Sequence, residues 1–167
     1  KANKFPLKDK QNINKLSKIL KSTNCKNFIL ISTIDVHKKK EIYGRNRLKF
    51  ENFIKKKFKK YIIIRLPAVF GKGLKKNLLF DLLNKNNLEN IFYNDIFQWF
   101  DLSQLYKEIK KKLNLNLNNK IIELYSPPIE NSEILRFFPN IKIDKKNKKK
   151  TIYNFKPKDG YYRNKKF

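Results

Sequence analysis

Residues 61–70 read YIIIRLPAVF, and this stretch decides the class of fold. Its apolar residues follow one another without polar alternation and are mostly β-branched, which is typical of a strand buried on both faces of a parallel sheet. Pro67 has no backbone N–H to donate, so the strand should stop there. The stretch therefore predicts a buried parallel strand over 61–66.

A second apolar run lies upstream, in KNFILIST at 26–33, and reads in the same way. Apolar residues between the two runs, over 43–59, recur with the spacing of an amphipathic helix, and so do those of 12–22. Helix, strand, helix, strand is the rhythm of a doubly wound α/β sheet. We expect the strands at 28–32 and 61–66 to be parallel neighbours, with the helix at 44–59 packed across them.

The second half of the chain has less regular patterning. It predicts helices over 75–85 and 102–113, a strand over 120–126 that ends at two prolines, and a short helix over 131–138. The run DKKNKKK at 144–150 carries like charges and is expected to be a solvated loop.

Net charge is the most prominent feature of the composition, at +27 over 167 residues. Such a charge favours binding to the phosphates of nucleic acids whatever their base sequence, and that binding should weaken as the salt concentration rises. Only five of the 41 basic residues are Arg, however, and Lys, Asn, Ile and Phe all have A/T-rich codons. Composition drift is therefore the favoured explanation, and a small basic nucleic-acid-binding protein remains the alternative.

Cellular location and completeness are judged from a few residues. The apolar runs are too short to cross a membrane and no secretion signal opens the chain, so we expect a cytoplasmic protein without a membrane partner. A lone Cys25 fits a reducing compartment, and with a lone His37 it predicts no metal site. The chain begins with Lys1 and contains no Met, which suggests a fragment of a longer protein.

Tyr43 and Arg47 lie four residues apart at the head of the helix between the two strands. The spacing by itself is common here, because five of the eight tyrosines have a basic residue four positions later. The context is less common. Ser32 and Thr33 end the first strand, and ligands of open α/β sheets bind at that edge.

The order ILISTIDV, YGRNRLKFE and YIIIRLPAVFG resembles the extended short-chain dehydrogenases/reductases, in the NAD-dependent epimerase/dehydratase branch. That family reads S-S/T-x-x-V-Y, then Y-G-x-S-K-x-x-x-E, then R-x-x-x-V-Y/F-G. The resemblance is specific over about 45 residues, from Phe28 to Gly73, and by order of elements it extends over 10–135. It implies part of a Rossmann-like NAD(P)-binding domain at 1–74 and a substrate-binding lobe with its tail at 75–167.

The resemblance also implies roles for individual residues. Tyr43 matches the general acid/base, and Arg47 stands where the family has a lysine that lowers the phenol pKa and binds the nicotinamide ribose. Thr33 matches the hydroxyl that orients the substrate oxygen. The remaining expected contacts are, for the cofactor, Ser32, Leu66 and Pro67, and, for the substrate, Ala68, Lys75, Asn77 and Gln98. Lys75 and Asn77 could equally be a solvated helix start.

Several positions depart from the family pattern. Arg47 replaces the lysine and cannot lose a proton. His37 stands at the usual Tyr, and Phe97 at an Arg that contacts the pyrophosphate in many relatives. The glycine-rich turn that cradles phosphates is absent from a chain with four glycines. The chain by itself is therefore expected to be inactive.

The expected function is that of part of an oxidoreductase or isomerase of the epimerase/dehydratase type. It would use NAD or NADP on a sugar or nucleotide-sugar, as a homodimer when complete. A non-catalytic relative with the same fold is the further alternative.

Overall fold

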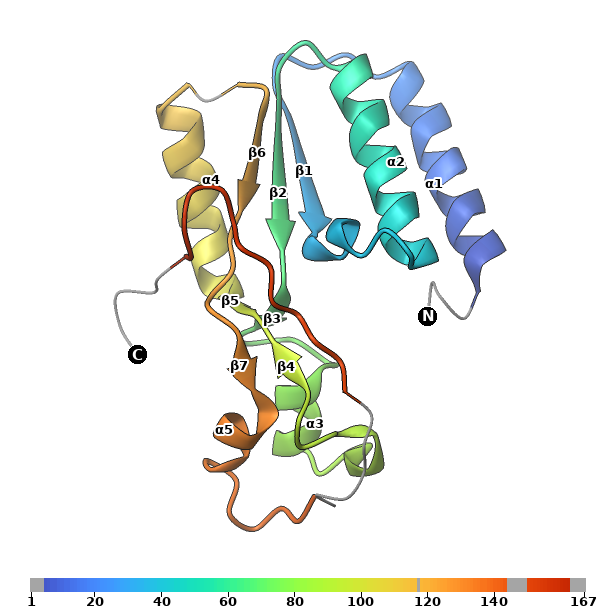
Figure 1. The fold of residues 1–167 in the computed structure, drawn as a ribbon. Coiled ribbons are helices and arrows are strands. Elements are labelled where there is room, and N and C mark those ends of the chain that lie inside the picture. Colours follow the sequence, from blue (N-terminus) through green and yellow to red (C-terminus); the bar gives the residue numbers. More distant parts are fainter. Residues whose placement is uncertain (1–4, 117, 144–149, 163–167) are drawn as a thin grey trace. The chain divides into compact units, whose positions relative to one another are not determined.

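The computed structural model describes residues 5–116, 118–143 and 150–162. The chain divides into two compact units, each built from two segments. The first unit contains 1–66 and 108–124, and the second contains 67–107 and 125–167. Figure 1 labels the helices and strands of both.

The first unit is built on a parallel sheet of three strands in the order β1-β2-β6. The strands are β1 (Phe28–Thr33), β2 (Tyr61–Leu66) and β6 (Lys120–Glu123). Phe28 pairs with Tyr61 and Thr33 with Leu66, so β1 and β2 run in register along their whole length. The expected parallel pairing of the two apolar runs is confirmed.

Helices α1 (Pro6–Lys21) and α2 (Ile42–Lys57) pack with the sheet through a core of aliphatic and aromatic side chains. Phe50 and Ile54 of α2 meet Ile13 of α1 there, and Phe28 stacks on Phe58 with ring centroids 4.2 Å apart. This burial of the apolar face of α2 confirms the predicted helix across the two strands. A further helix, α4 (Leu105–Asn114), precedes β6.

The second unit contains two short sheets. The strands β3 (Ala68–Phe70) and β5 (Trp99–Asp101) pair in parallel, and β4 (Ile96–Phe97) pairs antiparallel with β7 (Ile129–Glu130). Two short helices accompany them, α3 (Leu78–Leu83) and α5 (Asn131–Leu135). The described part of the unit also contains two short 3₁₀ helices, η2 (Leu88–Asn90) and η3 (Leu102–Gln104).

Several boundaries differ from those predicted. The predicted helix at 12–22 begins earlier, at Pro6, because a proline fits the first turn of a helix. The YIIIRLPAVF stretch is two strands in different sheets, β2 and β3, separated by Pro67. The helix expected at 102–113 opens with η3 before α4 begins, and the predicted loop at 144–150 lies almost entirely outside the described residues.

The chain passes between the units three times, after residues 66, 107 and 124, whereas the sequence predicted one passage, near residue 74. The return of 108–124 follows from β6, which adds to β2 as a third parallel strand. Within the described residues, no helix has the length and apolar character that crossing a membrane requires.

Candidate active site

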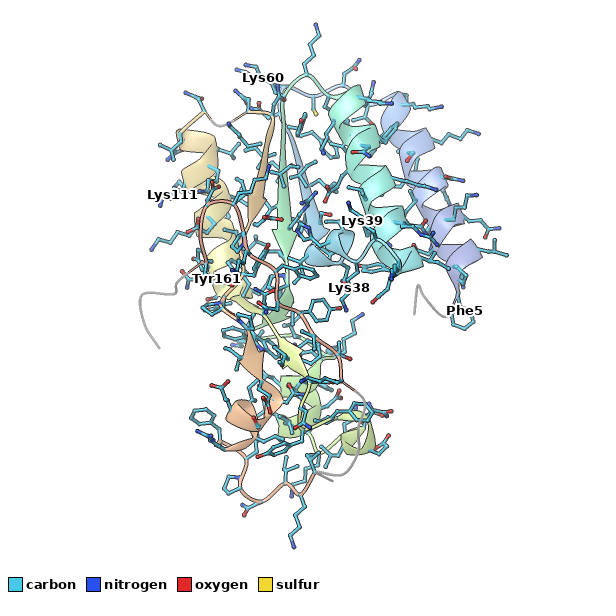
Figure 2. The ribbon with its side chains drawn as sticks, viewed as in Figure 1. Phe5, Lys38, Lys39, Lys60, Lys111 and Tyr161 are labelled. Carbon is cyan, nitrogen blue, oxygen red and sulfur yellow. The ribbon has the colours of Figure 1, made fainter. Side chains whose placement is uncertain are left out.

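The carboxyl ends of β1, β2 and β6 lie at one edge of the first unit's sheet, because the three strands are parallel. Thr33, Leu66 and Glu123 are the last residues of the three strands. Figure 2 shows Lys38 and Lys39 at this edge and Lys60 at the opposite one. The chain leaves β1 there through a 3₁₀ helix, η1 (Ile34–His37), and then enters α2.

Tyr43 is the second residue of α2, and its position is set by the glycine that follows it. A Cβ at Gly44 would overlap the backbone carbonyl of Asp35 in η1 and would lie 3.0 Å from the carbonyl oxygen of Lys38. Only a residue without a side chain lets the first turn of α2 approach η1 this closely. Gly44 therefore lets the first turn of α2 lie against η1, and the charge of Asp35 in η1 raises the pKa of the Tyr43 phenol.

Arg47 lies one helical turn after Tyr43 and contacts two groups. Its guanidinium carbon is 4.9 Å from the centre of the Tyr43 ring. Its Nη2 donates to Oδ1 of Asp9 at 2.5 Å, and the side-chain amide of Asn46 donates to Oδ2 at 2.9 Å. Asp9, on α1, is buried, so these two hydrogen bonds satisfy a carboxylate that would otherwise be costly to bury.

The pKa of the Tyr43 phenol lies above its ordinary value of 10.0. Burial raises this pKa most; the charge and hydrogen bond of Arg47 lower it, and the charges of Asp35 and Asp9 raise it again. Arg47 thus acts in the expected direction, but it does not outweigh burial. The expectation of a lowered phenol pKa needs this correction: in this structure Tyr43 is protonated at neutral pH.

Thr33 caps η1 with its hydroxyl. Its Oγ1 donates to Oδ2 of Asp35 at 2.8 Å and accepts from the Asp35 backbone N–H at 3.2 Å. The hydroxyl proton is therefore committed to a carboxylate, and the oxygen keeps a lone pair for one more donor. Asp35 therefore links Thr33 to Tyr43, because it accepts the Thr33 hydrogen bond and its charge raises the pKa of the Tyr43 phenol.

Ser32 is directed into the interior and not toward the edge. Its hydroxyl donates to Glu51 of α2 at 2.8 Å, and Glu51 is fully buried. Arg65 of β2 forms two hydrogen bonds to the same carboxylate, from Nε at 3.0 Å and from Nη2 at 2.7 Å. Burial alone would lower the pKa of Arg65, but the hydrogen bonds and charges of Glu51 and Glu123 raise it. The group is a satisfied buried ion pair.

Glu123 and His37 extend this pair across the sheet. Nη1 of Arg65 donates to Oε1 of Glu123 at 3.2 Å, and Nε2 of His37 lies 2.6 Å from the same oxygen. Burial raises the pKa of Glu123, but the hydrogen bonds and charges of His37 and Arg65 together lower it to about 2. His37, which stands at the family's usual Tyr, is therefore anchored to the end of β6.

The expected substrate residues lie in the second unit, where two of them have structural partners. Gln98 is fully buried; its amide donates to the carbonyls of Ser126 and Phe155 and accepts from the Phe155 backbone. Asn77 caps α3 by accepting from the backbone N–H at position 80, and it also donates to the backbone carbonyl at position 69. The side-chain amides of both residues are thus already used in hydrogen bonds to the backbone.

The other residues expected at the site lie at the end of β2 and in the segment that follows it. Lys75 is exposed in the loop before α3, and Ala68 begins β3. Leu66 is buried at the end of β2, and Pro67 follows it at the passage between the units.

Sequence reasoning missed Asp9, Asp35, Glu51 and Glu123. A signal existed, because acids number only 14 against 41 basic residues, so each acid within an apolar segment is conspicuous. Asp9 precedes Ile13 by four positions, which places both on the buried face of α1.

Comparisons with known proteins bear on this geometry. No family model matches the chain, and no curated protein does. Among solved structures, the chain is similar to several enzymes, including the following three. UDP-glucuronic acid 4-epimerase from Bacillus cereus, in complex with UDP-glucuronic acid and NAD, is 15% identical with a TM-score of 0.62, covering 86% of this chain and 54% of that one. This is the fold of the nucleotide-sugar epimerases.

The other two similarities agree. UDP-N-acetylglucosamine 4-epimerase from Methanobrevibacter ruminantium is 16% identical with a TM-score of 0.62, covering 96% of this chain and 62% of that one. The enzyme WbmG from Bordetella bronchiseptica, in complex with NAD, is 10% identical with a TM-score of 0.64, covering 86% and 55%. The expected Rossmann-like fold is thereby confirmed, and the chain spans little more than half the length of these solved structures.

Proposed function

We propose that this epimerase-fold chain forms the proton-transfer part of an NAD(P)-dependent epimerase/dehydratase-type enzyme that acts on a sugar or nucleotide-sugar. The observation that carries the proposal is a set of contacts at the carboxyl edge of the sheet: Arg47 lies against the Tyr43 ring, and Asp35, which accepts a hydrogen bond from Thr33, raises the pKa of the same phenol. A phenol, a fixed cation and an oriented hydroxyl are what proton exchange with a substrate oxygen requires.

Arg47 offers a test of whether these residues fit a dinucleotide. Its Nε is buried and has no hydrogen-bond partner among the described residues. A buried N–H without a partner costs free energy, and a ribose hydroxyl would satisfy it. The residues present therefore fit the nicotinamide end of NAD(P), with Arg47 as its ribose contact and Leu66 and Pro67 as apolar neighbours. NAD(P), when bound, supplies the hydride chemistry.

The chain's own residues handle the proton. A phenol with a raised pKa holds its proton at neutral pH, so Tyr43 is poised to donate to a carbonyl oxygen of the substrate. Thr33, whose proton points to Asp35, accepts a hydrogen bond from a substrate hydroxyl. Ser32 supports the first unit through its hydrogen bond to Glu51 instead of touching the cofactor.

The substitution Tyr43→Phe tests the proposal. Turnover of nucleotide-sugars is measured with a longer protein that contains this chain together with a glycine-rich, phosphate-binding turn. Loss of the proton-transfer group should lower turnover by a factor of roughly 10² to 10⁴. Substrate binding and the free energy of unfolding should change much less than turnover, because the ring still lies against Arg47 and only the hydroxyl, with its hydrogen bond to Arg47, is lost. Full turnover in this variant would exclude Tyr43 as the acid.

A further inference from the structure

His37 and Glu123 join segments that lie 86 residues apart in the chain. Nε2 of the imidazole lies 2.6 Å from Oε1 of the carboxylate; the His37 side chain is 33% exposed and that of Glu123 only 10%. His37 is the last residue of η1, and Glu123 is the last residue of β6. The pair therefore ties η1 to the end of the third strand.

The helix η1 is held from its other side by α2. Gly44 meets the backbone carbonyl of Asp35 so closely that no methyl group would fit between them. Asp35 in turn accepts the Thr33 hydroxyl and raises the pKa of Tyr43. The position of η1, fixed between Gly44 and Glu123, thus determines where Asp35 lies relative to both groups of the proton-transfer site.

The bond from His37 also completes a longer network. Arg65 donates to the same oxygen of Glu123 and, on its other side, to Glu51, which accepts from Ser32. Ser32, Arg65 and Glu123 are paired neighbours on β1, β2 and β6. Hydrogen bonds in such buried chains reinforce one another, so this network is a rigid support for a residue attached to its end.

We propose that His37 is a positioning residue for the Tyr43 site, acting by anchoring η1 to Glu123. The inference rests on the proposed function, but its test measures the pKa of Tyr43 and does not require turnover. Without the anchor, η1 moves away from α2, water reaches the Tyr43 phenol, and Asp35 recedes from it. Both changes lower the phenol pKa toward 10.0, because burial and the Asp35 charge are what raise it.

Two substitutions distinguish the hydrogen bond to Glu123 from the general effect of a polar side chain at position 37. In His37→Gln the amide nitrogen can take the place of Nε2, whereas in His37→Asn it reaches only as far as Nδ1. The full chain is labelled with ¹³C-tyrosine, the Tyr43 resonance is assigned with Tyr43→Phe, and its titration midpoint is measured by NMR. We expect the midpoint to fall toward 10.0 in His37→Asn and to stay at the parent value in His37→Gln.

Lys39→Gln is the matched control, because it removes a charge from an exposed residue two positions after His37 (Lys39 is labelled in Figure 2). Unchanged signals of the other tyrosines show that each variant is folded. If His37→Asn is not folded, His37→Ser takes its place, because a serine side chain also does not reach Glu123. Equal midpoints in the Gln and the short-side-chain variants would overturn the proposal. Failure of the proposed function would instead appear as undiminished turnover in Tyr43→Phe, which this titration does not measure.

Discussion

The ionisation of Tyr43 is decided by Arg47 on one side and by burial, Asp35 and Asp9 on the other. Arg47→Leu removes the charge and the hydrogen bond that lower the phenol pKa, so we expect this pKa to rise further above 10.0. Arg47→Lys keeps the positive charge and should produce a smaller rise. ¹³C-tyrosine NMR titration of the full chain measures both, and a fall of the midpoint in the Leu variant would contradict the assignment of these charges.

The carboxylate of Glu123 makes stability depend on acidity. Its pKa is lowered from 4.5 to about 2 in the folded chain, so its contribution is fully present above pH 4.5 and is lost as the pH falls toward 2. Glu123→Gln removes this dependence. Between pH 4.5 and 2, the free energy of unfolding of the variant should therefore fall by about 1–3 kcal/mol less than that of the parent. Urea unfolding at a series of pH values measures the difference. Glu89→Gln, on an exposed 3₁₀ turn, should keep the parent slope; equal slopes in the Glu123 variant and the parent would show that Glu123 is not the titrating group.

At the scale of elements, the contact between η1 and α2 depends on Gly44. Gly44→Ala gains about 1 kcal/mol of helix propensity, but the added methyl overlaps the Asp35 carbonyl, and such overpacking costs about 1–3 kcal/mol or more. Because the obstacle is backbone, relief requires η1 to shift. We therefore expect net destabilisation in urea unfolding.

Asn52→Ala is the control for helix propensity, since Asn52 lies exposed on the same helix. It should be neutral or slightly stabilising. If Gly44→Ala behaves like this control, the close approach of α2 to η1 is not maintained in solution.

At the scale of the whole molecule, the proposed site has a phenol, a cation and an oriented hydroxyl, but the sequence has no glycine-rich turn for the pyrophosphate. The four glycines are at 44, 71, 73 and 160, and Gly44 is used in helix packing. We expect the 167-residue chain to bind NAD with a dissociation constant weaker than about 1 mM, as measured by calorimetry. Micromolar binding that persists in Arg47→Leu would mean that another part of the chain holds the dinucleotide.

The amino-acid sequence by itself determined the parallel sheet and the place of Tyr43. FILIST and YIIIRL are unbroken apolar runs, which are stable only when covered on both faces, and the helical spacing between them leaves a crossover as the simplest connection. Pro67 also marked the end of β2, because a proline cannot donate to a strand ladder.

Only the tertiary structure decided which charges meet. Asp9 pairs with Arg47 across 38 positions, Arg65 with Glu123 across 58, and His37 with Glu123 across 86. A chain with 41 basic residues offers every acid many partners of equal charge, and local spacing cannot choose among them. The choice is made where packed strands and helices bury an acid, because a buried carboxylate is tolerated only beside the few donors that the fold brings within reach.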